Sequence, residues 1–202
     1  MTSLVEPGNI VPLYEYLYRR NLINSYLEED IGSGDITSEA VIPTDFYAEA
    51  EVWCRGTIEG VVICGVEEAS IAFDICGCYT TKLVEDGAIV TNNLQVIAVK
   101  GDAKAILKAE RTGLNLLMRM SGVATESRKY NVLLRKFGIN TKITATRKTS
   151  PGMRIFDKKA IAIGGGHPHR MGLYDMILIK DNHIAIVGNA RDCVRMARKQ
   201  VG

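Results

Sequence analysis

The chain has 202 residues, of which 47% are hydrophobic and 24% charged, and its net charge is +2 at pH 7. These are ordinary values for a globular protein with a sizeable core, and they exclude a largely disordered chain. No apolar run is long enough to span a bilayer, and the first residues lack the basic-then-apolar pattern of a signal peptide. We therefore expect a cytoplasmic protein with no membrane partner.

The cysteines are five, an odd number: Cys54, Cys64, Cys76, Cys78 and Cys193. Only Cys76 and Cys78 are close in sequence, and their spacing is not a usual zinc pattern. We expect reduced, mostly buried thiols, with no disulfide framework and no metal site.

The first quarter of the chain predicts a helix followed by a loop. Residues 12–27 have helical apolar spacing, with a stripe formed by Leu13, Tyr16, Leu17 and Ile23. Residues 29–37 contain two glycines and short polar side chains, which predicts a tight loop with side chains capping backbone amides. This loop matches neither a P-loop nor a dinucleotide fingerprint.

Short apolar runs separated by Gly, Asp and Asn predict a β-rich layer next. The expected strands are 48–54, 60–64, 80–84 and 96–99, and one helix near 66–73 interrupts them. Such an α+β layer also occurs in carrier and binding domains, so it indicates little about chemistry.

Helices and strands alternate in the second half. Asp102 is expected to cap a helix running to about residue 121, and Gly138 to end a second helix near 125–137. The expected elements that follow are a strand at 141–146, a helix at 152–163, a strand at 176–179 and a helix at 190–201. This order predicts βα units with parallel strands. Two such units cannot close a barrel of about eight strands, so we expect a chain, or an ordered region, that has been cut short.

Positive charge is concentrated between residues 142 and 180. Eight Lys or Arg against two Asp give this segment +6, whereas the rest of the chain sums to −4. Arg147-Lys148 and Lys180 each follow an expected strand, and ligands bind at the carboxyl ends of parallel strands. We expect these cations to converge on a small polyanion; a solvated basic face stays open as the alternative.

The residue types in this segment suit anions. Arg147 and Arg170 have planar forks for carboxylates, while Lys148 and Lys180 are compact charges for phosphates. His169 can donate to an anion or move a proton.

The three glycines 164–166 before His169 would let an anion approach the backbone closely. His167 and His183 are expected to be structural. No Ser-His-Asp, Cys-His or metal-ligand pattern stands out. Phe156 and Tyr174 are the only aromatic residues in the basic stretch, so we expect no nucleic-acid partner.

Four segments, taken together and in order, resemble the quinolinate phosphoribosyltransferase family. They are 29–37, 110–125 (ERTGLNLLMRMSGVAT), 146–154 (TRKTSPGMR) and 159–184. The resemblance implies an α/β fold: an N-terminal α/β sandwich with its linking helix over residues 1–120, then the first part of an incomplete TIM-like α/β barrel over residues 121–202, truncated in this chain.

The resemblance also implies an activity, which is carboxylating nicotinate-nucleotide pyrophosphorylase in NAD synthesis. Quinolinate and phosphoribosyl pyrophosphate would react with Mg²⁺ to give nicotinate mononucleotide, pyrophosphate and CO₂. Lys148 and Lys180 would act as catalytic cations, and a homodimer is implied because Arg111 reaches the site of a neighbouring subunit in this family. The implied substrate-binding residues are Arg111, Thr146, Arg147, Lys148, His169, Arg170 and Lys180.

Some family parts have no counterpart here. The carboxylates that support magnesium and the loop that binds the 5′-phosphate lie on later barrel strands, beyond Gly202, so no metal ligand is assigned. Two alternatives stay open: the related pyrophosphorylase-like protein of molybdenum transport, and a non-catalytic polyanion-binding protein. The pair Arg147 and Arg170 favours a dicarboxylate, and hence quinolinate.

Overall fold

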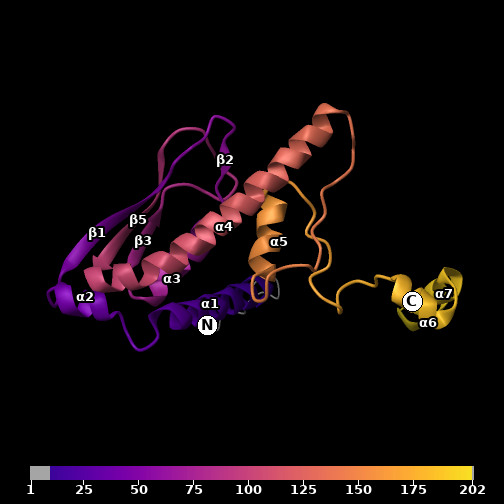
Figure 1. The fold of residues 1–202 in the computed structure, drawn as a ribbon, viewed down its shortest axis with the longest axis horizontal. Helices are drawn as coiled ribbons and strands as arrows, with labels where there is room; N and C mark the ends of the chain where they lie inside the picture. Colours follow the sequence, from indigo (N-terminus) through magenta and orange to yellow (C-terminus); the bar gives the residue numbers. More distant parts are fainter. Residues whose placement is uncertain (1–9, 202) are drawn as a thin grey trace, which may run out of the picture.

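A computed structural model describes residues 10–201, and the side chains from residue 15 onward. The helices are α1 (Ile10–Ile31), α2 (Ile36–Val41), α3 (Val66–Ile75), α4 (Ala103–Lys136), α5 (Arg154–Ile163), α6 (Asp181–Val187) and α7 (Ala190–Val201). The strands are β1 (Tyr47–Cys54), β2 (Val61–Val62), β3 (Tyr79–Lys82), β4 (Ile89–Val90) and β5 (Leu94–Asp102). The predicted α/β class is confirmed, although among residues 10–201 the sheets are confined to β1–β5, residues 47–102 (Figure 1).

The N-terminal layer is a three-stranded antiparallel sheet in the order β1-β5-β3, beside a small β2-β4 pair. Strand β5 buries Val96, Ile97 and Val99 beneath α3 and α4, and the pairing with β1 shifts register at Val96, where two consecutive residues are buried. Phe73 from α3 and Ile106 from α4 complete this core. The two-residue β4 was not predicted, because two apolar residues carry no measurable period.

A second core joins the N-terminal layer to the second half of the chain. Ile23 and Leu27 of α1, Leu116 of α4, and Phe156 and Ala160 of α5 are all buried together. The predicted stripe on α1 is right for Ile23 and for Tyr16, which packs against this core, whereas Leu17 is 48% exposed and the side chain of Leu13 lies outside the described residues. Helix α5 therefore packs into the body of the protein by its apolar face.

Helix α4 is one continuous helix of 34 residues, so the predicted break near residues 121–125 is wrong. Asp102 caps its start as predicted, since its carboxylate accepts from the Ala105 amide at 3.1 Å. A glycine inside a helix costs only about 1 kcal/mol relative to alanine, and Gly122 is too weak a breaker to end a well-packed helix. Gly138 follows the helix with a φ of +66°, as predicted. The expected domain boundary at 120/121 falls inside α4.

The segment 29–37 is partly helical. Helix α1 continues to Ile31, and Asp35 caps the short α2 by accepting from the amides of Thr37 and Ser38, both at 3.1 Å. The predicted capping is confirmed, whereas α2 itself was missed. The turn between the helices requires positive φ at Gly32 and Gly34.

The two strands predicted in the second half are not formed. The segment 141–146 makes only one parallel bridge, Thr144 to His167, with the Ala145 amide donating to the His167 carbonyl at 2.9 Å. The run 176–179 pairs with no strand in residues 10–201, and Ile177 is 52% exposed. A strand needs a hydrogen-bonded neighbour along its length, and apolar sequence alone does not supply one. The predicted parallel sheet is therefore reduced to a bridge, and the helices α6 and α7 stand apart from the body (Figure 1).

The predicted burial of the thiols is confirmed for three of the five cysteines. All five thiols are free, and Cys64, Cys78 and Cys193 are buried. Burial raises the pKa of Cys64 to about 12 and that of Cys78 to about 11. Within residues 10–201, no helix combines the length and the apolar character needed to cross a membrane.

A buried ion network fastens α5 to the N-terminal layer. Glu68 of α3 is fully buried and accepts from Arg19 at 2.6 Å and from Lys159 of α5 at 2.9 Å. The ammonium of Lys159 also lies 2.8 Å from Asp86, whose carboxylate accepts from the amide of Val66 at the start of α3. Burial opposes the charge of Lys159, but the carboxylates outweigh it and raise the pKa of this ammonium.

Replacing Lys159 tests the network. Lys159→Met leaves the buried Glu68 carboxylate with one cation fewer, and we expect a loss of about 2–3 kcal/mol in the free energy of unfolding. Chemical denaturation provides the measurement. Lys129→Met is the control, because the Lys129–Glu126 pair is exposed and such pairs contribute little. Equal stability of the two variants would contradict the role of the network.

Candidate functional site

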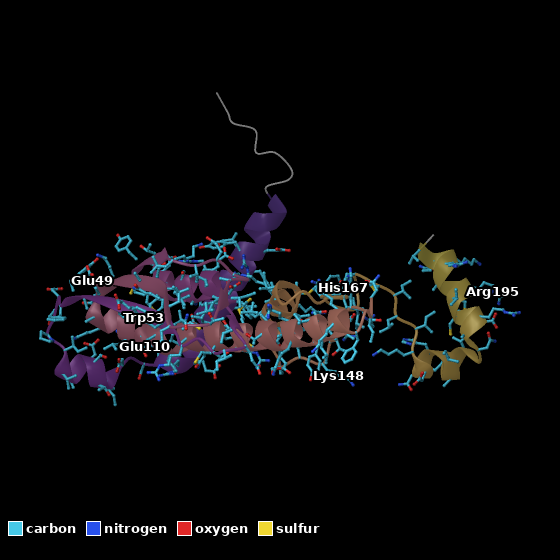
Figure 2. All side chains as sticks on the ribbon, turned by 90° about the horizontal axis from the view of Figure 1, so that it is seen from above. Glu49, Trp53, Glu110, Lys148, His167 and Arg195 are labelled. Carbon is cyan, nitrogen blue, oxygen red and sulfur yellow. The ribbon has the colours of Figure 1, made fainter. Side chains whose placement is uncertain are left out.

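Six of the seven predicted binding residues meet at one cavity of about 340 Å³. The cavity is lined by Thr144, Ala145, Thr146, Arg147, Lys148, His169, Arg170, Leu178 and Lys180. The site is therefore built by three separate segments, 144–148, 169–170 and 178–180. In Figure 2, the labelled Lys148 and His167 lie toward the same end of the molecule.

The cavity is strongly cationic. Four of its lining residues carry positive charge, and none of the nine, all of which the structure describes, carries a carboxylate. The Nε–H of Arg147 is buried and donates to no acceptor among the described residues. A buried donor without a partner costs free energy, and an anion that came within hydrogen-bond distance of it would recover this cost. The charge and this free donor both suit an anion.

Local hydrogen bonds set the first segment in place. The hydroxyl of Thr146 accepts from the Lys148 amide at 3.1 Å, which forms a tight turn around Arg147. The bridge to His167 anchors the residue before it, Ala145, which is buried. Thr146 thus shapes the backbone that presents the two cations Arg147 and Lys148.

The second segment carries a strained residue. His169 has a φ of +54°, which non-glycine residues rarely adopt and which costs about 1 kcal/mol or more. Arg170 is only 5% exposed, and its Nη1 donates to the Met176 carbonyl at 3.0 Å. Since a guanidinium has five N–H donors, others stay available to a ligand. The ring of His167 accepts from the His169 amide at 3.0 Å, in agreement with a structural role.

The third segment brings Lys180 from the start of α6. The Lys180 carbonyl accepts from the amides of His183 and Ile184, which begins the helix. The ring of His183 accepts from the Lys180 amide at 2.9 Å, so His183 also has the structural role that was predicted. The side chain of Lys180 is left exposed at the mouth of the cavity.

Gly164 and Gly166 serve packing, and Gly165 has a left-handed backbone with a φ of +85°, which corrects the predicted role of the three glycines in anion approach. A Cβ on Gly164 would lie 2.3 Å from the Ala124 carbonyl oxygen of α4, and one on Gly166 would lie 2.9 Å from the Ser127 hydroxyl. Only glycine lets this loop cross α4 so closely. None of the three lines the cationic cavity.

Part of the basic charge is used elsewhere in the fold. Lys159 belongs to the network with Glu68. Arg154 donates to Thr149 and to the Met171 carbonyl, and the buried Lys158 donates to the Pro168 carbonyl. Burial lowers the pKa of Lys158. The excess of +6 in the sequence therefore overstates the charge that faces the ligand, and sequence reasoning missed the role of Arg154 and Lys158.

Arg111 does not join the other six residues. It lies on α4 with 60% of its side chain exposed, 3.9 Å from Glu110, and it does not line the cavity. Its sequence neighbour Glu110 is drawn near the opposite end of the molecule from Lys148 (Figure 2). Within one chain, Arg111 cannot be assigned to this site.

Two larger hollows differ from the cationic cavity because their linings carry charges of both signs. One of about 440 Å³ has Glu29 and Asp30 beside Arg119, and one of about 720 Å³ has Glu15 beside Arg154. Carboxylates in the lining disfavour a polyanion. The smaller cationic cavity is therefore the better candidate.

No metal site is formed by the described residues. Among residues 10–201, no group of three or more His, Cys, Asp or Glu side chains is placed to hold a metal ion. No chemical step is therefore assigned to a metal ion.

Two family models match the chain. The N-terminal domain of quinolinate phosphoribosyl transferase matches residues 35–121, and the C-terminal domain matches residues 123–202. The chain belongs to this family. The resemblance of the four sequence segments is thereby confirmed.

The relatives agree with this assignment. A probable nicotinate-nucleotide pyrophosphorylase [carboxylating] from Methanothermobacter thermautotrophicus is 41% identical over 90% of this chain, and the nicotinate-nucleotide pyrophosphorylase [carboxylating] from Mycobacterium leprae is 39% identical over 91%. These matches span only 64% and 65% of the relatives' own lengths. The names favour the pyrophosphorylase reading over the protein of molybdenum transport.

Solved structures of the family have the same fold. The nicotinate-nucleotide pyrophosphorylase from Francisella tularensis superposes with a TM-score of 0.80 at 36% identity, over 91% of this chain and 64% of that one. NadC from Streptococcus pyogenes gives 0.81 at 27% identity, over 99% of this chain and 66% of that one. The arrangement of the N-terminal sheet and the helices after it is thus shared with these enzymes.

Asp175 offers a pH test of the loop around His169. Its carboxylate accepts from the amides of Gly172 at 2.9 Å and Met171 at 2.6 Å, and these bonds hold the pKa of Asp175 below its ordinary value of 3.8. Because the folded pKa is lowered, the bonds are intact above the ordinary pKa and are lost as pH falls through the lowered one.

We expect the NMR shifts of the Met171 and Gly172 amides to titrate together with a midpoint below 3.8. Asp175→Asn should abolish this titration. A midpoint at or above the ordinary aspartate value would show that the carboxylate does not hold the loop.

Proposed function

We propose that this chain binds quinolinate and phosphoribosyl pyrophosphate and supports phosphoribosyl transfer with decarboxylation, as the names of its relatives describe. The products would be nicotinate mononucleotide, pyrophosphate and CO₂. The observation that carries the proposal is the convergence of four cations, with no carboxylate, on one cavity.

The cavity suits a small planar diacid. Arg147 and Arg170 come from different segments, so two guanidinium forks can each take one carboxylate. His169 also lines the cavity and can donate to an anion, and Leu178 offers an apolar contact for a ring. The volume of about 340 Å³ is at the lower end for ligand sites, which fits a single pyridine ring better than a nucleotide.

Lys148 and Lys180 have the catalytic part in this proposal. Both are exposed at the cavity, where they would neutralise the phosphate and carboxylate charges of the two substrates. As pyrophosphate leaves, the anomeric carbon becomes cationic and the pyridine nitrogen attacks it. Fixed ammonium groups stabilise the departing charge.

The decarboxylation needs no protein nucleophile. Once alkylated, the cationic ring nitrogen stabilises the electron pair that stays on the adjacent ring carbon when its carboxylate departs as CO₂, and that carbon then takes up a proton from solvent. The cavity supplies the charges that bind and orient the diacid, and this is the contribution we assign to the described residues.

Other parts of the proposal rest on the family. Mg²⁺ would accompany phosphoribosyl pyrophosphate, although the described residues offer it no ligand cluster. A homodimer with Arg111 shared across subunits would explain why this side chain lies exposed and away from the cavity of its own chain. A cytoplasmic location and the lack of a nucleic-acid partner also belong to the proposal, and the five free thiols suit a reducing compartment.

Arg147→Ala tests the site directly. Losing the guanidinium leaves a substrate carboxylate without its charged partner, so we expect quinolinate binding to weaken by about 1.5–3 kcal/mol, about 10- to 150-fold in Kd. Isothermal titration calorimetry gives the value. Arg195→Ala is the control, since Arg195 lies on α7 and is 76% exposed. Unchanged affinity of the Arg147 variant would reject the assignment.

A non-catalytic polyanion-binding protein is the competing outcome. Competition separates the two, with benzene-1,2-dicarboxylate and benzene-1,4-dicarboxylate as probes, since the two diacids carry the same charge. A quinolinate site prefers the diacid with adjacent carboxylates, whereas a general cationic surface responds to charge alone. Equal competition by the two diacids would favour the non-catalytic reading.

Mixing variants tests the shared site. Arg111→Ala and Arg147→Ala should each depress CO₂ release from carboxyl-labelled quinolinate. If Arg111 acts across a dimer, an equal mixture forms half heterodimers with one intact site each, so about a quarter of the unaltered activity should return. Either variant alone at the same total concentration is the control. No recovery on mixing would count against a shared site.

A further inference from the structure

Two cations of α5 donate hydrogen bonds to the loop that carries His169 and Arg170. The Nη1 of Arg154 donates to the Met171 carbonyl at 3.2 Å, and the ammonium of Lys158 donates to the Pro168 carbonyl. Four residues apart, Arg154 and Lys158 lie on the same helix face. Their two acceptors lie immediately before and immediately after the pair His169-Arg170.

Lys158 is an unusual residue to find at such a position. It is 2% exposed, and its one hydrogen bond within residues 10–201 is to the Pro168 carbonyl. The carboxylate of Asp175 acts on this ammonium only through its charge and forms no hydrogen bond with it. A buried ammonium that is hydrogen-bonded only to a carbonyl is costly compared with one paired directly to a carboxylate. Its neighbour Lys159 shows the ordinary solution, with Glu68 and Asp86 as partners. Packing alone would be served at lower cost by methionine.

Arg154 links the two walls of the cavity. Its Nε donates to the Thr149 hydroxyl at 3.3 Å, one residue after Lys148, while its Nη1 reaches the loop after Arg170. One guanidinium therefore ties the segment of Arg147 and Lys148 to the segment of His169 and Arg170. The planar fork of arginine suits such a two-sided contact.

The loop needs holding, because His169 has a left-handed backbone. A non-glycine residue persists at such a φ only where its surroundings fix it. Here the carbonyls on both sides are fixed by α5, and α5 is itself fixed in the core by Phe156 and Ala160.

We propose that Arg154 and Lys158 are positioning residues of the anion site: they hold the carbonyls that flank His169 and Arg170 and set this pair opposite Arg147 and Lys148. Neither lines the cavity or contacts the ligand. The choice of quinolinate as the ligand in the test rests on the proposed function. The inference that Arg154 and Lys158 hold the loop does not.

The test compares Lys158→Met with Lys159→Met in the full chain. Lys158→Met keeps the volume and removes the donor, so we expect a melting temperature equal to or above that of the unaltered protein. Hydrogen exchange of the amides in residues 167–172 should rise about tenfold or more, and the Kd for quinolinate should rise about tenfold. Lys159→Met should show the opposite balance, with a lower melting temperature and a smaller change in Kd than Lys158→Met.

Each outcome is decisive. Unchanged exchange in residues 167–172 of the Lys158 variant would overturn the inference, and so would raised exchange with an unchanged Kd. If the unaltered chain binds no quinolinate, the proposed function fails, and the exchange measurement still decides whether Lys158 holds the loop. Arg154→Met is the second variant, with raised exchange expected in both 147–150 and 167–172.

Discussion

The buried carboxylate of Glu68 is the constraint on which the arrangement of this protein depends. A charge removed from water must be paired, and here its partners come from two distant segments, Arg19 of α1 and Lys159 of α5. The pairing brings α5 against the N-terminal layer in one orientation. Since Lys159 faces the layer, Arg154 and Lys158 are left to face the loops of the cavity. The same short helix thus serves stability on one side and the site on the other.

Once α5 is placed in this way, backbone contacts of the loop that follows it form the site. The loop after α5 crosses α4 where Gly164 and Gly166 allow a close approach, and then bridges to residue 144. That bridge brings segments 144–148 and 169–170 to one cavity, and the segment that follows, 178–180, adds Lys180. Positive charges held close together repel one another when neither a carboxylate nor a ligand neutralises them. The cavity is therefore better explained by anion binding than by packing.

Much of this could be predicted from the sequence, and the failures have physical causes. Strong local signals held: the Asp102 cap, the Gly138 stop and the convergence of Arg147, His169, Arg170 and Lys180. The predicted break in α4 was wrong because packing along the helix outweighs the weak helix-breaking tendency of Gly122. The strand at 176–179 was wrong because apolar sequence does not supply a pairing partner. The role of Arg154 and Lys158 could not be seen, since a cation that holds a carbonyl and one that binds a ligand look alike in a sequence.

The central claim is that guanidinium groups from two segments receive one dianion. The most direct measurement is NMR of the arginine Nε–H groups during titration with quinolinate. The buried Nε–H of Arg147, which has no acceptor among the described residues, should shift together with that of Arg170, along one binding curve with a single Kd. Shifts confined to Arg195 and other exposed arginines, or separate curves for Arg147 and Arg170, would contradict the account.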